Sequence, residues 1–298
     1  MIGILLALIV AFLKSLWELA GKIFTDESKV SSIDEYSLSL WTRLMSFIIL
    51  FPIALYIGIP SITQDMWLIL FFSSILWAIG TVTALKAVKY GDLSLVSPLS
   101  ALTIPFLLIT SYFITRELPN LYGYIWVSII FIGTYFLQLH ETKSGILWPL
   151  KAIYNDQWAK YMLVTALLWS ITAPLDKLWV IEIWALQWMF FSNAGILFVL
   201  IIYMIFKKKH VLLSEMTSLS VLKKVWVITV LWWIGIFLQM LALKYTLVIY
   251  VIALKRASGM FSVFFWYLFF QEKNISQKLF AAAIMFVWVL IISILWNI

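Results

Sequence analysis

Long runs of apolar residues, separated by short polar segments, extend along the whole chain of 298 residues. A bilayer core is about 30 Å thick, which a helix of about 20 apolar residues crosses. The pattern therefore predicts ten membrane-spanning helices, at residues 2–19, 38–59, 66–87, 93–115, 121–139, 159–179, 184–206, 225–243, 247–270 and 279–296.

The two halves of the chain share a pattern of polar residues. Glu117 recurs as Glu272 and Lys22 recurs as Lys177, both 155 residues later, and a Lys-Tyr dipeptide follows the same offset. One register at well-separated positions indicates an internal duplication. The expected division is a first repeat, a connecting loop and a second repeat, at residues 1–142, 143–158 and 159–298.

Five helices per repeat is an odd number, so the second repeat must enter the membrane upside down relative to the first. Inverted repeats are a construction of secondary transporters, whose substrate site lies near the midplane between the repeats. The expected fold is therefore an all-α membrane protein, with ten transmembrane helices arranged as two inverted five-helix repeats around a central substrate site.

Composition excludes several other classes. The chain is 64% hydrophobic and 12% charged, which on a soluble protein would expose large apolar patches. It has no cysteine and two histidines, and it lacks the motifs of intramembrane proteases. The net charge of +7 lies mostly in short loops, as expected beside a membrane rather than beside nucleic acid. We expect a multi-pass protein of the cell membrane without enzymatic activity, metal or cofactor.

An adjacent pair of cations, Lys255 and Arg256, lies inside the ninth predicted span. Lys255 is about 12 Å deep at 1.5 Å per residue, and a charge at the bilayer centre costs roughly 2.5–3.5 kcal/mol on insertion scales. A wet cavity or a counter-ion would offset this cost. Recognition of a substrate anion is the favoured interpretation; the alternative is a structural salt bridge or snorkelling to the nearer face.

The first predicted span supplies the expected neighbours of this pair. Lys14 and Glu18 are four residues apart and share one helix face. Lys14 is expected at the depth of Lys255, with Glu18 as the nearest anion and the candidate for proton coupling. Asp176 is expected near the end of its span, paired with Lys177. The excess of cations predicts an anionic or carboxylate-bearing substrate, such as an amino acid, an organic acid or a sugar phosphate.

Other intramembrane side chains are weaker candidates for the cavity wall. Hydrogen bonding between helices and simple helix packing are the alternatives for them. These candidates are Ser97, Ser100, Asn193, Gln239, Trp17 and Trp169. Pro98 and Pro105 remove backbone hydrogen bonds in the fourth predicted span and predict a break there.

Two segments of the chain resemble the EamA repeat of the drug/metabolite transporter superfamily. They are KYGDLSLVSPLSALTIPFLLI in the fourth predicted span and LLWSITAPLDK in the sixth. The resemblance implies a ten-helix transporter with a central cavity for small metabolites, active as a monomer or homodimer in the lipid bilayer. A carrier of lipid or polyprenyl phosphate, or less favourably an intramembrane lipid-modifying enzyme, is the alternative.

The pair Lys255-Arg256 also resembles the phosphate-binding pair of triose-phosphate translocators, although a further lysine of those proteins has no counterpart here. Orientation stays open at this point. The loops after odd-numbered spans hold fourteen Lys and Arg residues and the opposite loops three, which places both termini outside the cell. The resemblance implies the cytoplasmic side.

Overall fold

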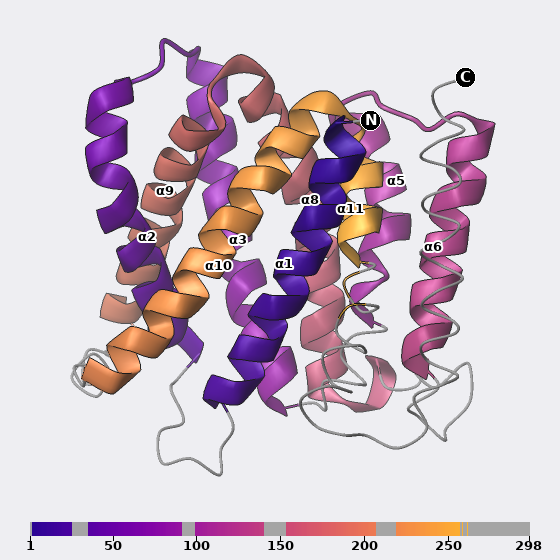
Figure 1. Cartoon of the computed structure of the whole chain (residues 1–298), viewed down its shortest axis with the longest axis horizontal. Helices are drawn as coiled ribbons and strands as arrows, with labels where there is room; N and C mark the ends of the chain where they lie inside the picture. Colours follow the sequence, from indigo (N-terminus) through magenta and orange to yellow (C-terminus); the bar gives the residue numbers. More distant parts are fainter. Residues whose placement is uncertain are drawn as a thin grey trace.

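The computed structural model describes residues 2–25, 35–90, 99–139, 153–206 and 219–256, with 258 and 261. The described residues form a bundle of helices that run between two faces (Figure 1). The helices are α1 (Ile2–Thr25), α2 (Glu35–Ile57), α3 (Gln64–Tyr90), α5 (Thr103–Ile114), α6 (Leu121–Leu139), α8 (Gln157–Glu182), α9 (Ala185–Phe206), α10 (Leu219–Tyr245) and α11 (Val248–Arg256).

Helix lengths agree with the apolar pattern over most of this part of the chain. Among the residues that the structure describes, five helices are long and apolar enough to cross a membrane, and three shorter apolar segments accompany them. The sixth helix, α8, ends at Glu182, nearly one turn beyond the predicted end at residue 179. The tenth predicted span and the second half of the ninth lie outside the described residues. The all-helical membrane architecture is confirmed to this extent.

The fourth predicted span contains a break beside Pro105. Proline has no N–H to donate to the carbonyl of residue i−4, here Ala101. The Ala101 carbonyl instead accepts the N–H of Ile104 at 2.9 Å, and residues 101–102 form a turn before α5 begins at Thr103. The predicted break at Pro105 is confirmed, whereas Pro98 lies outside the described residues.

Helices of the first half pack chiefly against helices of the second half. The most extensive contacts join α3 to α8, α1 to α10 and α2 to α9, followed by α3 to α9, α5 to α8 and α1 to α11 (Figure 1). The proposed repeat relation exchanges the α3–α8 contact with the α1–α10 contact, and the α5–α8 contact with the α1–α11 contact. The substrate site expected between the repeats would therefore lie along α1, α3, α8, α10 and α11.

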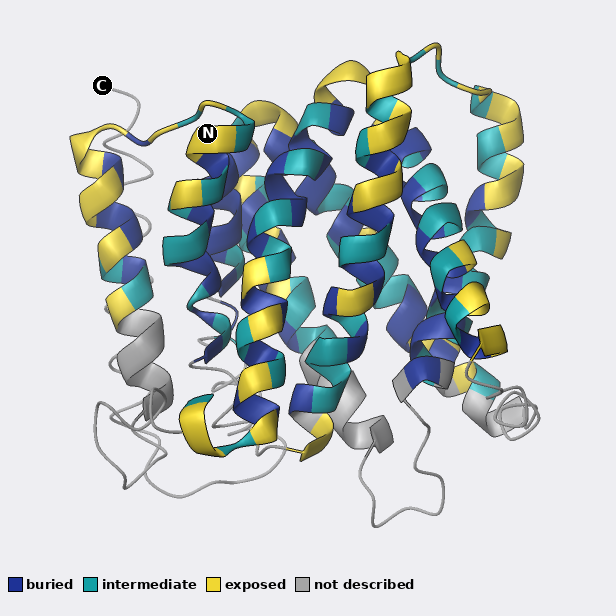
Figure 2. Cartoon of the chain, turned by 180° about the vertical axis from the view of Figure 1, so that it is seen from behind, coloured by how far each residue is buried: buried dark blue, intermediate teal, exposed yellow. Residues whose placement is uncertain are grey.

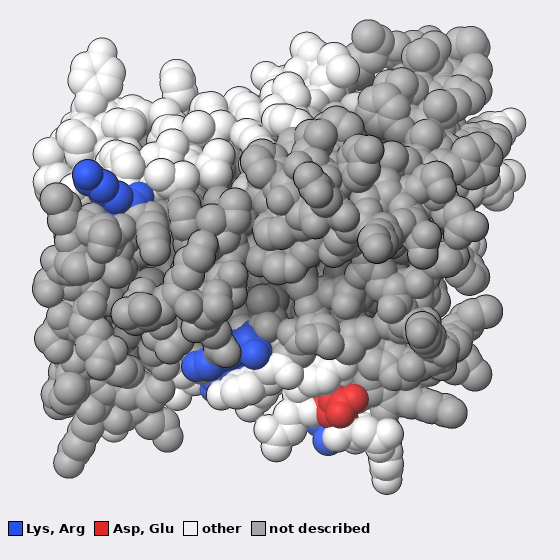
Figure 3. Space-filling model, turned by 60° about the horizontal axis from the view of Figure 1, so that its bottom comes forward, with Lys and Arg blue, Asp and Glu red and all other residues white. Residues whose placement is uncertain are grey.

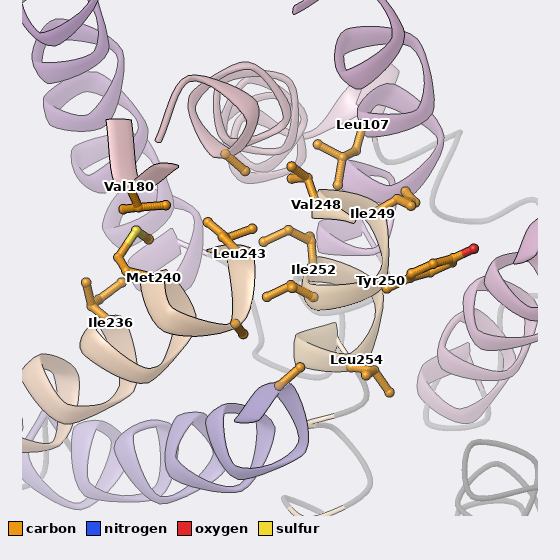
Figure 4. Packing of buried hydrophobic residues seen from close by; sticks show 14 of the residues in the cluster. Leu107, Val180, Ile236, Met240, Leu243, Val248, Ile249, Tyr250, Ile252 and Leu254 are labelled. Carbon is orange, nitrogen blue, oxygen red and sulfur yellow. The ribbon is translucent and has the colours of Figure 1, made fainter. Parts of the chain in front are cut away.

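Buried apolar side chains pack closely where α10 passes into α11, at the upper end of the bundle in Figure 1. Leu243 and Val248 are completely buried there, beside Met240 and Ile252 and facing Leu107 of α5 (Figure 4). Lipid tails are as apolar as these side chains, so close packing rather than expulsion of water holds such helices together. This packing fixes the position of the last described turn of α11, which carries both predicted cations.

The outer surface of the bundle is apolar. Large side chains such as Phe72 and Phe198 are 59% and 60% exposed, and exposed residues follow the outward faces of the helices (Figure 2). Viewed from the lower end in Figure 1, the described charged side chains appear as a few isolated groups (Figure 3). This surface suits a protein whose sides face lipid and whose charges lie at its ends or in its interior.

Candidate functional site

A small cavity lies between α1, α10 and α11. The cavity has a volume of about 20 Å³, which is enough for about one ordered water molecule. Small-molecule sites usually enclose several hundred Å³, so a metabolite would require these helices to separate. The lining residues are Val10, Leu13, Lys14, Trp17, Leu231, Trp232, Gly235, Ile236, Gln239 and Lys255.

Four residues predicted from the sequence meet at this cavity: Lys14, Trp17, Gln239 and Lys255. The Lys255 ammonium donates a hydrogen bond to Gln239 Oε1 at 2.6 Å. It also lies 5.9 Å from the centre of the Trp232 ring, within the range of a cation–π interaction. The ammonium of Lys255 is therefore held between an amide oxygen and an indole face.

Lys14 approaches the same region from α1. Its ammonium donates to the hydroxyl of Ser258, a buried residue two positions beyond α11, at 3.0 Å. The rings of Trp17 and Trp232 lie 5.3 Å apart beside it. Lys14 and Lys255 thus line one cavity, in agreement with the similar depth predicted for them.

The two adjacent cations point to different helices. The Arg256 guanidinium donates to Thr103 Oγ1 at 2.8 Å and lies 5.4 Å from the Trp169 ring. Successive residues of a helix are rotated by about 100°, so Lys255 faces α1 and α10 while Arg256 faces α5 and α8. The structure does not bring Arg256 to the cavity wall together with Lys255.

Ser100 and Trp169 belong to the surroundings of Arg256. The Ser100 carbonyl accepts the Thr103 hydroxyl proton at 2.7 Å, so it helps to orient the Thr103 oxygen that receives the guanidinium. Trp169 supplies the ring over which Arg256 lies. Both candidates therefore lie at the interface of α5, α8 and α11 rather than in the cavity.

A further buried cation, Arg43 of α2, was not among the sequence candidates. Its guanidinium donates to Asn193 Oδ1 at 3.0 Å and lies 5.7 Å from the Trp232 ring, the ring that also faces Lys255. The Asn193 side chain also donates to the Met189 carbonyl of its own helix at 2.6 Å, while its bond with Arg43 links α9 to α2. The sequence could have indicated this residue, because Arg43 lies five residues inside a predicted span and a charge within a span is usually functional.

Asp176 occupies a different position from the one expected. It is completely buried, and it accepts hydrogen bonds from Trp77 Nε1 at 3.0 and 3.3 Å and from Ser73 Oγ at 3.4 Å, both on α3. The extra turn of α8 beyond the predicted end moves Asp176 deeper into the bundle. Lys255 and Arg43 are close enough to act on its charge electrostatically.

The expected pairing of Asp176 with Lys177 is wrong, because the two side chains leave the helix in different directions. Lys177 forms an ion pair with Glu117 and donates to the Thr246 carbonyl at 2.9 Å. Glu117 also accepts the N–H of Val248, the first residue of α11, at 3.3 Å. Glu117 thus caps the start of α11.

The remaining candidates are only partly placed. Ser97 lies outside the described residues, and of Glu18 only the backbone, within α1, is described. Trp17 and Trp169 each have a buried indole N–H that makes no hydrogen bond to the described residues. Because buried donors are normally paired, the Trp17 N–H at the cavity is a donor that a bound molecule could satisfy.

Charges in the interior of the bundle are predominantly positive. Among the described residues, the interior of the bundle contains four cations, Lys14, Arg43, Lys255 and Arg256, and the carboxyl group of Asp176. The two lysines at the cavity carry N–H donors of the kind that form charge-assisted hydrogen bonds with anionic groups.

Comparison with known proteins gives the class of this molecule. A solved structure, described only as "Crystal structure of protein", matches it with a TM-score of 0.70 and 13% identity over 96% of each chain, a likeness of fold. A relative in Lactococcus lactis subsp. lactis (strain IL1403), the "Putative sugar uptake protein YxfA", is 28% identical over 149 residues. The match covers 48% of this chain and 48% of the relative, about half the length of each.

Residues 1–139 match the sequence model of the EamA-like transporter family. The match covers the first predicted repeat almost to its end. Together with the apolar helices, it identifies a multi-pass integral protein of the cell membrane. Through residues 1–139 the chain is similar to the EamA-like transporter family, in agreement with the resemblance of its sequence motifs.

Proposed function

We propose that this protein is a secondary transporter that carries a small anionic metabolite across the membrane without changing it chemically. The observation that carries the proposal is the convergence of Lys14 and Lys255 on one cavity, near a further buried cation, Arg43. Cations inside a membrane protein are expensive. Their cost is offset when an anion from solution binds between them.

We propose alternating access between two inverted five-helix repeats as the mechanism. The helix contacts support it, because α1 packs on α10 and α3 packs on α8, and the repeat relation exchanges these two contacts. The candidate cavity lies between α1 of the first repeat and α10 and α11 of the second. A rocking motion of one repeat against the other would enlarge the cavity toward one face at a time.

The substrate proposed is an anion that carries a sugar, an amino acid or another small organic group. Two indole rings, those of Trp17 and Trp232, provide flat apolar wall beside the lysines. The relative named for sugar uptake gives sugar acids and sugar phosphates priority in a first screen. Proton coupling belongs to this proposal, because a buried carboxylate lies near the cations.

The first experiment measures thermal unfolding of the purified protein with glucuronate, glucose 6-phosphate, glutamate or neutral glucose. A ligand that binds the folded state stabilises it by about 2.7 kcal/mol at a concentration of 100 Kd. We expect one of the anions to raise the Tm of the wild type and of Lys160→Ala, an exposed control in α8, but not of Lys255→Ala.

Transport of the anion that binds is then followed in proteoliposomes, with mass analysis of the molecule recovered inside. Equal stabilisation of wild type and Lys255→Ala by anions would give Lys255 a structural role. Stabilisation by a short-chain polyprenyl phosphate alone would point to the lipid carrier, and recovery of an altered molecule would point to an enzyme.

A further inference from the structure

Asp176 of α8 is a buried carboxyl group at a contact between two helices. It lies at the contact between α8 and α3, completely buried, with hydrogen bonds from the indole of Trp77 and the hydroxyl of Ser73. Both donors are neutral. A carboxylate withdrawn from water is costly unless a cation compensates it or a proton neutralises it.

Two cations on other helices act on Asp176. They are Arg43 of α2 and Lys255 of α11. Arg43 is linked to Asn193 at 3.0 Å and Lys255 to Gln239 at 2.6 Å. Each cation therefore has an amide partner while it remains within electrostatic range of the carboxyl group.

The other charged groups near α8 are engaged elsewhere. Lys177, the next residue of α8, is paired with Glu117. Arg256 of α11 lies over Trp169, about two turns before Asp176 on α8, and donates to Thr103 of α5. Among the described residues, Lys255 and Arg43 are thus the cations that can balance a negative charge on Asp176.

Lys255 connects this carboxyl group to the cavity. Its ammonium lines the cavity with Lys14, and it also acts on Asp176. An anion bound in the cavity would bring a second negative charge close to the Lys255 ammonium. A bound anion therefore competes with Asp176 for Lys255, and this competition favours the protonated form of Asp176.

We propose that Asp176 is the proton-binding residue of this transporter and that it couples one proton to one substrate anion. The inference rests on the proposed function. With the anion bound, Asp176 carries a proton taken from water on the side of entry, and Lys255 faces the anion. After release of the anion and the proton on the other side, the Asp176 carboxylate balances Lys255 while the empty transporter returns.

The loaded transporter and the empty transporter therefore have the same net charge at the site. A monoanion and a proton together add no net charge, so transport is electroneutral symport. One pH unit corresponds to about 1.36 kcal/mol, which sustains about a tenfold concentration ratio of the anion. Asp176 is assigned this role because it is buried against α3 and lies near two cations.

The first test labels wild-type protein with dicyclohexylcarbodiimide, which modifies protonated carboxyl groups in apolar surroundings, and locates the adduct by peptide mass spectrometry. We expect an adduct on Asp176 that decreases as the pH rises. An adduct on Glu18 with none on Asp176 at any pH overturns the proposal. This measurement needs neither a substrate nor a variant, so it decides the protonation of Asp176 even if the proposed function fails.

The second test uses proteoliposomes with radiolabelled glucuronate as the probe monoanion. With the outside more acidic by one pH unit, wild type and Asp65→Asn, an exposed control in the first turn of α3, should accumulate glucuronate up to about tenfold. Asp176→Asn should still exchange internal for external glucuronate, because its amide imitates the protonated carboxyl, but should not accumulate it.

The outcomes of the two tests separate the claims. Accumulation by Asp176→Asn equal to that of the wild type overturns the role of Asp176. Accumulation that depends on an imposed membrane potential overturns the one-to-one stoichiometry. Failure of wild type to move glucuronate counts against the proposed function for this probe, while the labelling result still decides the proton site. If Asp176→Asn does not fold, the labelling of wild type decides alone.

Discussion

The ion pair between Lys177 and Glu117 joins three parts of the molecule at one face. Lys177 lies in α8, Glu117 lies between α5 and α6, and both contact the start of α11 through the Thr246 carbonyl and the Val248 N–H. We predict that Lys177→Met loosens this face and exposes the cavity behind it. Removing the lysine leaves the carboxylate and the carbonyl without their common donor.

The magnitude follows from the burial of the pair. The side chains of Lys177 and Glu117 are 8% and 21% exposed, so water screens the pair in part. Coupling between residues in contact amounts to about 0.5–3 kcal/mol, and partial exposure favours the middle of that range. A change of about 1–2 kcal/mol alters the ratio of two states by a factor of about 5–30.

The assay uses a feature of the sequence, its lack of cysteine. A single cysteine is introduced at Val10, a cavity residue that is 2% exposed, and its labelling by a water-soluble maleimide is timed. Lys177→Met should increase the labelling rate by about 5–30-fold. Lys244→Met, which removes an exposed lysine at the end of α10, should leave the rate unchanged.

A charge swap provides the second control. The double variant Lys177→Glu/Glu117→Lys keeps opposite charges in contact and should restore a labelling rate near that of the wild type. A rate for Lys177→Met within about twofold of the wild type, well below the expected factor, would refute the reasoning. The pair would then stabilise the fold without restricting access to the cavity.

Three further predictions concern the repeat and the packing. The sequence repeat relates Glu272 to the capping glutamate, so Glu272→Gln should increase labelling of the same cysteine from the opposite side of the membrane in sealed vesicles. Asn193→Ala removes the acceptor of the buried Arg43 guanidinium and should lower the free energy of unfolding by about 1–3 kcal/mol, measured by denaturant titration; an unchanged midpoint would contradict it. Gly195→Ala would place a Cβ 2.2 Å from the Ser74 hydroxyl and should cost about 1–3 kcal/mol, a loss that adding Ser74→Gly should reverse in thermal unfolding.

Much of the architecture was predictable because a bilayer leaves the backbone few choices. Every N–H and C=O within the hydrocarbon must be paired internally, so long apolar runs become helices. The predicted span 121–139 coincides with α6, Leu121–Leu139. The break before Pro105 was equally local, since it follows from one missing N–H.

The site was only partly predictable. The depth of Lys14 and Lys255 could be counted along their helices, and the two side chains do line one cavity. The rotation of each helix about its own axis could not be predicted from the sequence, because packing against neighbouring helices sets it. That rotation separated Arg256 from Lys255 and directed it to Thr103.

From the sequence alone it followed that the chain forms apolar helices and that cations lie among them, and a repeat of its two halves was predicted. Tertiary structure decided which charges meet. Asp176 turned toward α3 instead of toward Lys177, and Arg43 came to face the same Trp232 ring as Lys255. Such contacts depend on which helices are neighbours and on how each helix is rotated about its axis. Both are properties of the packed bundle, so the sequence of one segment does not reveal them.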